Sequence, residues 1–91
     1  MSIMIKLLVF LDKTILITKI EESPSELGEP DCKLINPFEV KKPQVDGMAP
    51  TLESWLSGYT KQNEFMIHSD KILTIAEPTA RLIELYEELT K

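Results

Sequence analysis

Two apolar segments joined by a short polar turn constrain the fold more than any other feature of the sequence. Residues 4–11 and 14–20 are rich in apolar and β-branched side chains, and Asp12 and Lys13 separate them. This pattern predicts two strands joined by a tight hairpin. Residues 7–11 and 15–17 are apolar at consecutive positions. Because neighbouring residues of a strand point to opposite faces, both faces of this hairpin need cover.

Further short strands are expected along the chain. The segment 32–40 predicts a third strand, and proline at position 37 means that it bends, bulges or lies at an edge there. Residues 52–59 fit a strand or a short helix, with a strand favoured, and a turn follows over 58–63. The segments 65–68 and 72–76 predict two more strands, joined by residues 69–71. Pro, Gly and Ser mark surface loops at 21–31 and 42–50.

The last segment has helical rather than strand periodicity. Its apolar residues recur at the spacing of one helix face, which predicts a helix over about 78–90. Pro78 suits the first helical position, and Thr79 is available as a cap. We expect this face to dock on the sheet, because an isolated helix of this length is marginal in water. The docking residues are Leu82, Ile83, Tyr86 and Leu89.

These elements predict a mainly β protein with one domain over residues 1–91. A helix of about 18 Å cannot cover the second face of a five-stranded sheet. We therefore expect a small, strongly bent antiparallel sheet or barrel with a single C-terminal α-helix. The apolar outer surface that remains is expected to pair with other subunits, in a closed homo-oligomeric ring or in a two-fold dimer.

Size, cysteine content and charge narrow the class of protein. A chain of 91 residues buries a limited core, and one cysteine excludes an internal disulfide, which favours stabilisation by oligomerisation. The sequence shows neither a secretory signal pattern nor an apolar run long enough to span a bilayer, so a cytoplasmic protein is expected. The net charge of −5, from 15 acidic and 10 basic residues, differs from the basic surplus of most nucleic-acid-binding proteins.

The order of elements resembles the Sm-like (Lsm) family, whose subunits assemble into rings that bind RNA. Residues 10–20 are similar to the first hairpin of that family. Residues 67–72 fall where the family has isoleucine, arginine, glycine, a polar pair and a branched residue, in a loop that contributes to a uridine-binding pocket. The resemblance implies an Sm-like fold and possible contacts to single-stranded RNA, with no cofactor; the chain also resembles short bacteriophage proteins. The implied RNA contacts are His68, Ser69, Asp70 and Lys71.

No residue set in the sequence predicts catalysis or metal binding. His68 is the only histidine and Cys32 the only cysteine, which makes a transition-metal site implausible. His68, Ser69 and Asp70 are adjacent, whereas the members of a catalytic triad meet through the fold. Asp70 and Lys71 could hold a ribose or phosphate, but polar residues that form a turn are the commoner explanation. The sequence therefore predicts a non-enzymatic protein.

Three functional hypotheses remain open at this level. The first is an Sm-like ring that binds RNA. The second is a protein-interaction or structural module, with or without a phage origin, that binds no nucleic acid, and the acidic charge favours it. The third is a small hydrolase, for which no nucleophile, base and anion site can be named together.

Overall fold

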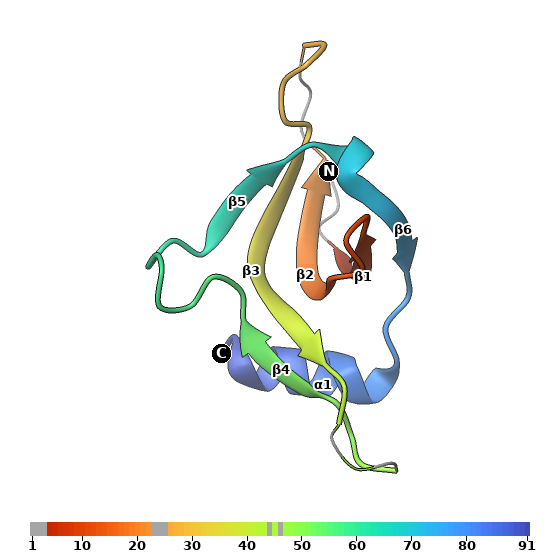
Figure 1. The fold of residues 1–91 in the computed structure, drawn as a ribbon. Helices are drawn as coiled ribbons and strands as arrows, with labels where there is room; N and C mark the ends of the chain where they lie inside the picture. Colours follow the sequence, from red (N-terminus) through yellow and green to blue (C-terminus); the bar gives the residue numbers. More distant parts are fainter. Residues whose placement is uncertain (1–3, 23–25, 44, 46) are drawn as a thin grey trace.

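The described residues form six strands, one 3-10 helix and one α-helix in the computed structural model (Figure 1). The structure describes residues 4–22, 26–43, 45 and 47–91, so residues 23–25, 44 and 46 of the predicted loops lie outside the described residues. The described part contains no helix that is both long and apolar enough to cross a membrane. The elements are β1 (Met4–Phe10), β2 (Ile15–Glu22), β3 (Cys32–Lys41), β4 (Thr51–Ser54), β5 (Glu64–Ile67), η1 (Ser69–Lys71), β6 (Ile72–Ala76) and α1 (Ala80–Leu89).

The strands form a single antiparallel sheet, which confirms the predicted fold class. The sheet order is β4-β3-β2-β1-β6, and β5 also pairs with β3. The first half of β3 pairs with β5 and its second half with β4, so β4 and β5 occupy one edge row in succession. The described sheet thus has six strands, one more than the predicted five, because two short strands share one row. The sheet is strongly bent, but β6 and β5 do not pair to close it.

The β1–β2 hairpin turns where the polar pair predicts. Lys13 has φ 74°, and its N–H donates to the carbonyl of Phe10 at 2.8 Å. The backbone N–H of Thr14 donates to the Asp12 carboxylate at 3.0 Å, so a side-chain hydrogen bond also stabilises the turn. A short polar residue that accepts from the backbone two positions ahead is typical of tight turns.

β3 bends at Asn36 and Pro37, as the proline predicted. The pairing of β2 with β3 shifts here, because Ile17 lies opposite Phe38 while Lys19 lies opposite Ile35. Two residues of β3 therefore face one of β2, which is a β-bulge, and Asn36 adopts φ 52°. On the other side of β3 the bulge falls between β4 and β5, so the missing proline N–H interrupts no pairing with them.

The segment 52–59 is a strand only in its first part. β4 ends at Ser54, and turns follow, in which Ser57 donates to the Ser54 carbonyl and Leu56 has φ 60°. The segment after β4 leaves β3 at the bulge, where the Trp55 N–H donates to the carbonyl of Pro37 at 3.1 Å. It returns to β3 at Asn63, whose carbonyl accepts from the N–H of Asn36 at 2.7 Å. This excursion separates β4 from β5.

β2 is covered on both faces at its centre, which agrees with the doubly apolar hairpin. Leu16 belongs to an inner core cluster with Leu8 and Leu34, inside the bend of the sheet. Its neighbour Ile17 belongs to a second cluster on the outer face, with Leu82 and Tyr86 of α1. Consecutive residues of β2 are thus both fully buried, each under a different layer.

α1 begins one residue after its cap, Thr79, whose hydroxyl accepts from the Leu82 N–H at 3.3 Å. The predicted role of Pro78 at the first helical position is wrong, because Pro78 precedes the cap. Leu82 and Tyr86 are buried against the sheet as predicted, whereas Leu89 is exposed and Leu85 packs against the cluster instead. A helix of ten residues reaches only one end of the sheet, where it lies below β3 and β4 in Figure 1.

Tyr86 joins the helix to the bulge of the sheet. Its hydroxyl accepts a hydrogen bond from the Lys19 N–H at 3.1 Å and donates one to the Ile35 carbonyl at 2.8 Å. The Thr18 hydroxyl donates to the same carbonyl at 3.1 Å. The register shift disrupts β2–β3 pairing at this point, so a buried side chain replaces the missing ladder partners.

Candidate functional site

The predicted RNA-contact loop, residues 68–71, forms η1 and the residue that precedes it. The N–H of Lys71 donates to the carbonyl of His68 at 3.1 Å, which closes a single 3-10 turn. The carbonyl of Lys71 accepts from the N–H of Leu11 at 3.2 Å, so the β1–β2 hairpin holds the end of the loop. The turn therefore connects β5 to β6 while it is anchored on a third segment.

Asp31 holds the other side of this loop, a contact that sequence reasoning missed. Its carboxylate accepts hydrogen bonds from the Ser69 N–H at 2.8 Å and from the Ser69 hydroxyl at 2.6 Å. These hydrogen bonds from Ser69 hold the pKa of the Asp31 carboxyl below its ordinary value. Aspartate and serine separated by 38 positions carry no local pattern, so only the fold brings them together.

His68 points to the same segment through a separate contact. Its Nε2 lies 3.1 Å from the carbonyl oxygen of Gly28. The serine next to it is bound to Asp31 rather than to the imidazole, so histidine does not stand between serine and aspartate as it does in a triad. Two loop residues thus use their polar atoms to tie η1 to the chain that leads into β3.

The four predicted contact residues are not brought together on one surface. His68 and Lys71 line a groove of about 490 Å³, whereas Ser69 lines a hollow on the other side of η1 and Asp70 lines neither. We call the first of these the Trp55 groove. Its other main lining residues are Phe10, Leu11, Trp55 and Met66.

The Trp55 groove combines aromatic rings with one lysine, Lys71, and one aspartate, Asp12. Trp55 packs edge-on against Phe65, with ring centroids 5.3 Å apart and an interplanar angle of 67°, which orients the indole. Lys71 supplies an ammonium group at the side of the groove. Aromatic rings beside a cation are the chemistry with which proteins hold unstacked bases of single-stranded nucleic acids.

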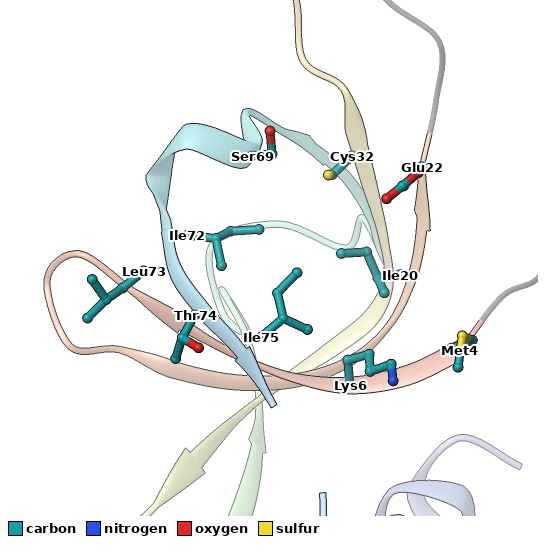
Figure 2. A pocket seen from close by; sticks show the side chains of 10 residues that line it. All are labelled: Met4, Lys6, Ile20, Glu22, Cys32, Ser69, Ile72, Leu73, Thr74 and Ile75. Carbon is teal, nitrogen blue, oxygen red and sulfur yellow. The ribbon is translucent and has the colours of Figure 1, made fainter. Parts of the chain in front are cut away.

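A larger hollow of about 650 Å³ lies inside the bend of the sheet (Figure 2). Its walls come from β1, β2, the start of β3, η1 and β6, and Ile20, Ile72 and Ile75 point into it. Lys6 and Met4 line one side of the hollow, and Glu22, Cys32 and Ser69 the other. The sequence offered one signal for this site, a lysine at position 6 within an otherwise apolar strand.

Residues 3–91 match a protein family described as a family of unknown function, DUF6561. The chain belongs to this family. A comparison with curated proteins gave no match. The matched region includes the whole sheet, both the groove and the hollow, and α1.

The single thiol of this DUF6561 member is placed for packing rather than reactivity. Cys32 is buried, and burial, together with the negative charges of Asp31 and Glu22, raises the pKa of its thiol. A nucleophilic cysteine needs the opposite shift, which a neighbouring cation supplies. Over the described ranges, no three His, Cys, Asp or Glu side chains gather into a group that could hold a metal ion.

The Asp31–Ser69 contact predicts a contribution to stability that depends on pH. Because the pKa of Asp31 is lower in the folded chain, its contribution is complete above the ordinary value of 3.8 and is lost as the pH falls through the lower, folded value. Urea unfolding of the wild type and of Asp31→Asn between pH 7 and pH 2 should show a stability difference that shrinks in acid. Asp70→Asn, on the same turn, is the control. A difference that is constant over this range would contradict the role of the carboxylate.

His68 should contribute little to folding. Its one hydrogen bond involves a partly exposed ring, so His68→Ala should lower the free energy of unfolding by at most about 1 kcal/mol. Chemical denaturation measures this value. A loss of about 3 kcal/mol or more would mean that the imidazole is part of the core and is not available to a ligand.

Proposed function

We propose that this protein is a non-enzymatic assembly module whose subunits join edge to edge into a closed homo-oligomeric ring. The observation that carries the proposal is the open sheet, which presents β6 at one end and the β4–β5 row at the other. Unpaired backbone groups at both ends favour addition of a strand from another subunit. The single domain, the bend and the Sm-like order of elements agree with such a ring.

Exposed apolar side chains at both ends support this mode of assembly. On β6, Leu73 is 62% exposed, and on β5 Met66 is 48% exposed. Apolar residues on an edge strand promote association with other chains, whereas charged residues suppress it. β6 and β5 are different surfaces, so their pairing is head-to-tail, and repetition of such a contact leads to cyclic symmetry.

The test uses two variants that each block one edge. Leu73→Lys places a charge on β6 and Met66→Lys places one on β5, and sedimentation equilibrium at micromolar concentration gives the mass. We expect the mass of the wild type to correspond to three or more chains of 10.4 kDa. Each variant alone should have the mass of one chain. An equimolar mixture of the variants should form a two-chain species, because one intact β6 meets one intact β5 and no further edge remains. Leu27→Lys, in a loop, is the control.

Other outcomes separate the alternatives. A two-chain wild type that Leu73→Lys dissociates and Met66→Lys leaves intact would indicate a two-fold dimer through β6, and the ring would be rejected. A wild-type mass equal to one chain up to high concentration would reject both forms of assembly.

RNA binding is a second candidate function, which the Trp55 groove favours. The groove places Trp55 beside His68 and Lys71. The indole of Trp55 would stack on an unstacked base, and the ammonium of Lys71 would bind one phosphate. The net charge of −5 is unfavourable for non-specific phosphate binding, so this proposal depends on the groove.

A uridine-rich oligonucleotide titrated by filter binding at two salt concentrations tests this candidate. Affinity should fall as salt rises, with a log–log slope of about −0.7 for each phosphate neutralised. Lys71→Met should weaken binding, whereas Lys42→Met, outside the groove, should not. Absence of binding at low salt would leave the alternative, an assembly or protein-interaction module that binds no nucleic acid.

A further inference from the structure

The hollow inside the bend of the sheet has the size and the wall chemistry of a small-molecule site. Its volume of about 650 Å³ falls within the range of roughly 300–1,000 Å³ that is typical of ligand pockets. Three isoleucines, Ile20, Ile72 and Ile75, converge on its centre in Figure 2. Ile75 remains 54% exposed although its side chain points inward, so this wall has apolar surface that a ligand would cover.

Lys6 adds one cation to these apolar walls. Its side chain is only 16% exposed, and its ammonium pairs with the carboxylate of Glu77, which is 75% exposed. The charge therefore lies at the edge of an apolar chamber, while its counter-ion comes from a residue open to solvent. A second anion that enters the hollow competes with this solvent-exposed carboxylate for the ammonium of Lys6.

We propose that the hollow binds a small amphiphile that carries a carboxylate on an aliphatic chain. The chain lies along the three isoleucines, and the carboxylate takes the place of Glu77 on the ammonium of Lys6. Glu22, on the other side of the hollow, repels an anion and so favours a single orientation with the carboxylate at Lys6. This proposal does not rest on ring formation or RNA binding.

Octanoate is a suitable probe, and 1-octanol is its uncharged match. Isothermal titration of the wild type should give saturable octanoate binding with a dissociation constant below about 1 mM, and 1-octanol should bind about tenfold more weakly. Backbone amide shifts in an NMR titration should be largest in β1 and β6. No saturation by octanoate, or equal affinity for the two probes, would overturn the proposal.

Variants of the ion pair give opposite expected effects. Lys6→Met keeps most of the side-chain volume and removes the charge, so octanoate affinity should fall about tenfold while 1-octanol affinity is unchanged. Glu77→Gln removes the competing carboxylate, so octanoate affinity should rise several-fold. Lys41→Met is the matched control, because Lys41 is a strand lysine paired with Glu39 at 3.3 Å outside the hollow. Weaker binding by Glu77→Gln, or an equal loss in the control, would reject the assigned role of Lys6.

A variant of the apolar wall tests the position of the chain. Ile75→Glu should abolish binding of both probes, whereas Leu89→Glu, a similarly exposed position on α1, should leave it unchanged. Urea unfolding of each variant confirms that it is folded. Binding that survives Ile75→Glu would place the ligand elsewhere and overturn the proposal. Sedimentation mass tests ring formation, and isothermal titration tests ligand binding. Failure of one proposal is therefore distinguishable from failure of the other.

Discussion

Replacement of Tyr86 by alanine should lower the free energy of unfolding by about 3–5 kcal/mol, as expected for a large aromatic residue in a core. Tyr86 is fully buried between α1 and the sheet. Its ring meets Phe38 edge-on, with centroids 5.8 Å apart and an interplanar angle of 86°, and its hydroxyl binds backbone groups at the bulge. The variant therefore loses packing and leaves the partly buried N–H of Lys19 without its partner. Urea denaturation followed by circular dichroism measures the change.

Tyr86→Phe separates the hydroxyl from the ring. Loss of the hydrogen bonds alone should cost about 1–3 kcal/mol, because the Lys19 N–H is left buried without a partner. Tyr59→Phe, at an exposed position, is the control and should have little effect. If Tyr86→Phe were as stable as the wild type, the hydroxyl would have no part in holding the helix to the bulge.

Tyr86 should also make the free energy of unfolding depend on pH in alkaline solution. Burial raises the pKa of the Tyr86 phenol above its ordinary value of 10.0, so the folded chain favours the neutral form. This contribution is complete below pH 10.0 and is lost as the pH rises through the higher, folded value. The stability gap between the wild type and Tyr86→Phe should therefore narrow above that pH.

Leu34→Ala is expected to have a comparable effect through the inner cluster. Leu34 is fully buried at the centre of the bend, packed with Leu8 and Leu16, and its truncation should cost about 3–5 kcal/mol. Domains of this size have a total stability of about 5–14 kcal/mol, so the variant should be close to unfolding at room temperature. Thermal and urea unfolding measure the loss.

Leu27→Ala provides the contrast, since Leu27 is fully exposed and should change stability by less than about 0.5 kcal/mol. If Leu34→Ala were as stable as this control, the neighbouring side chains would fill the space left by Leu34 at no cost in the free energy of unfolding. Leu34→Met, which nearly conserves volume, should cost less than about 1.5 kcal/mol and confirms that a loss in Leu34→Ala arises from the cavity.

The candidate site was predictable only in part. Residues 69–71 were correctly placed in a polar connection between two strands, because their sequence interrupts two apolar segments. His68 was expected to end the strand 65–68, but β5 ends one residue earlier, at Ile67. The distribution of residues 68–71 over two sides of η1 was not predictable, since it depends on which backbone atoms close the 3-10 turn. Asp31 and Glu77 were not recognised as partners of Ser69 and Lys6, because both contacts join residues far apart in the chain.

Local patterns by themselves determined the strands, the hairpin at Asp12 and Lys13, the bend at Pro37, the cap at Thr79 and the mainly β class. These features depend on the period of apolar side chains and on the backbone limits of proline and turn residues, which act within a few positions. Only the tertiary structure decided that β4 and β5 share one row, that Tyr86 replaces the ladder bonds at the bulge, and that a hollow remains beside Lys6. The physical reason is that register, bulge and cavity arise from contacts between distant segments, whose geometry no local pattern specifies.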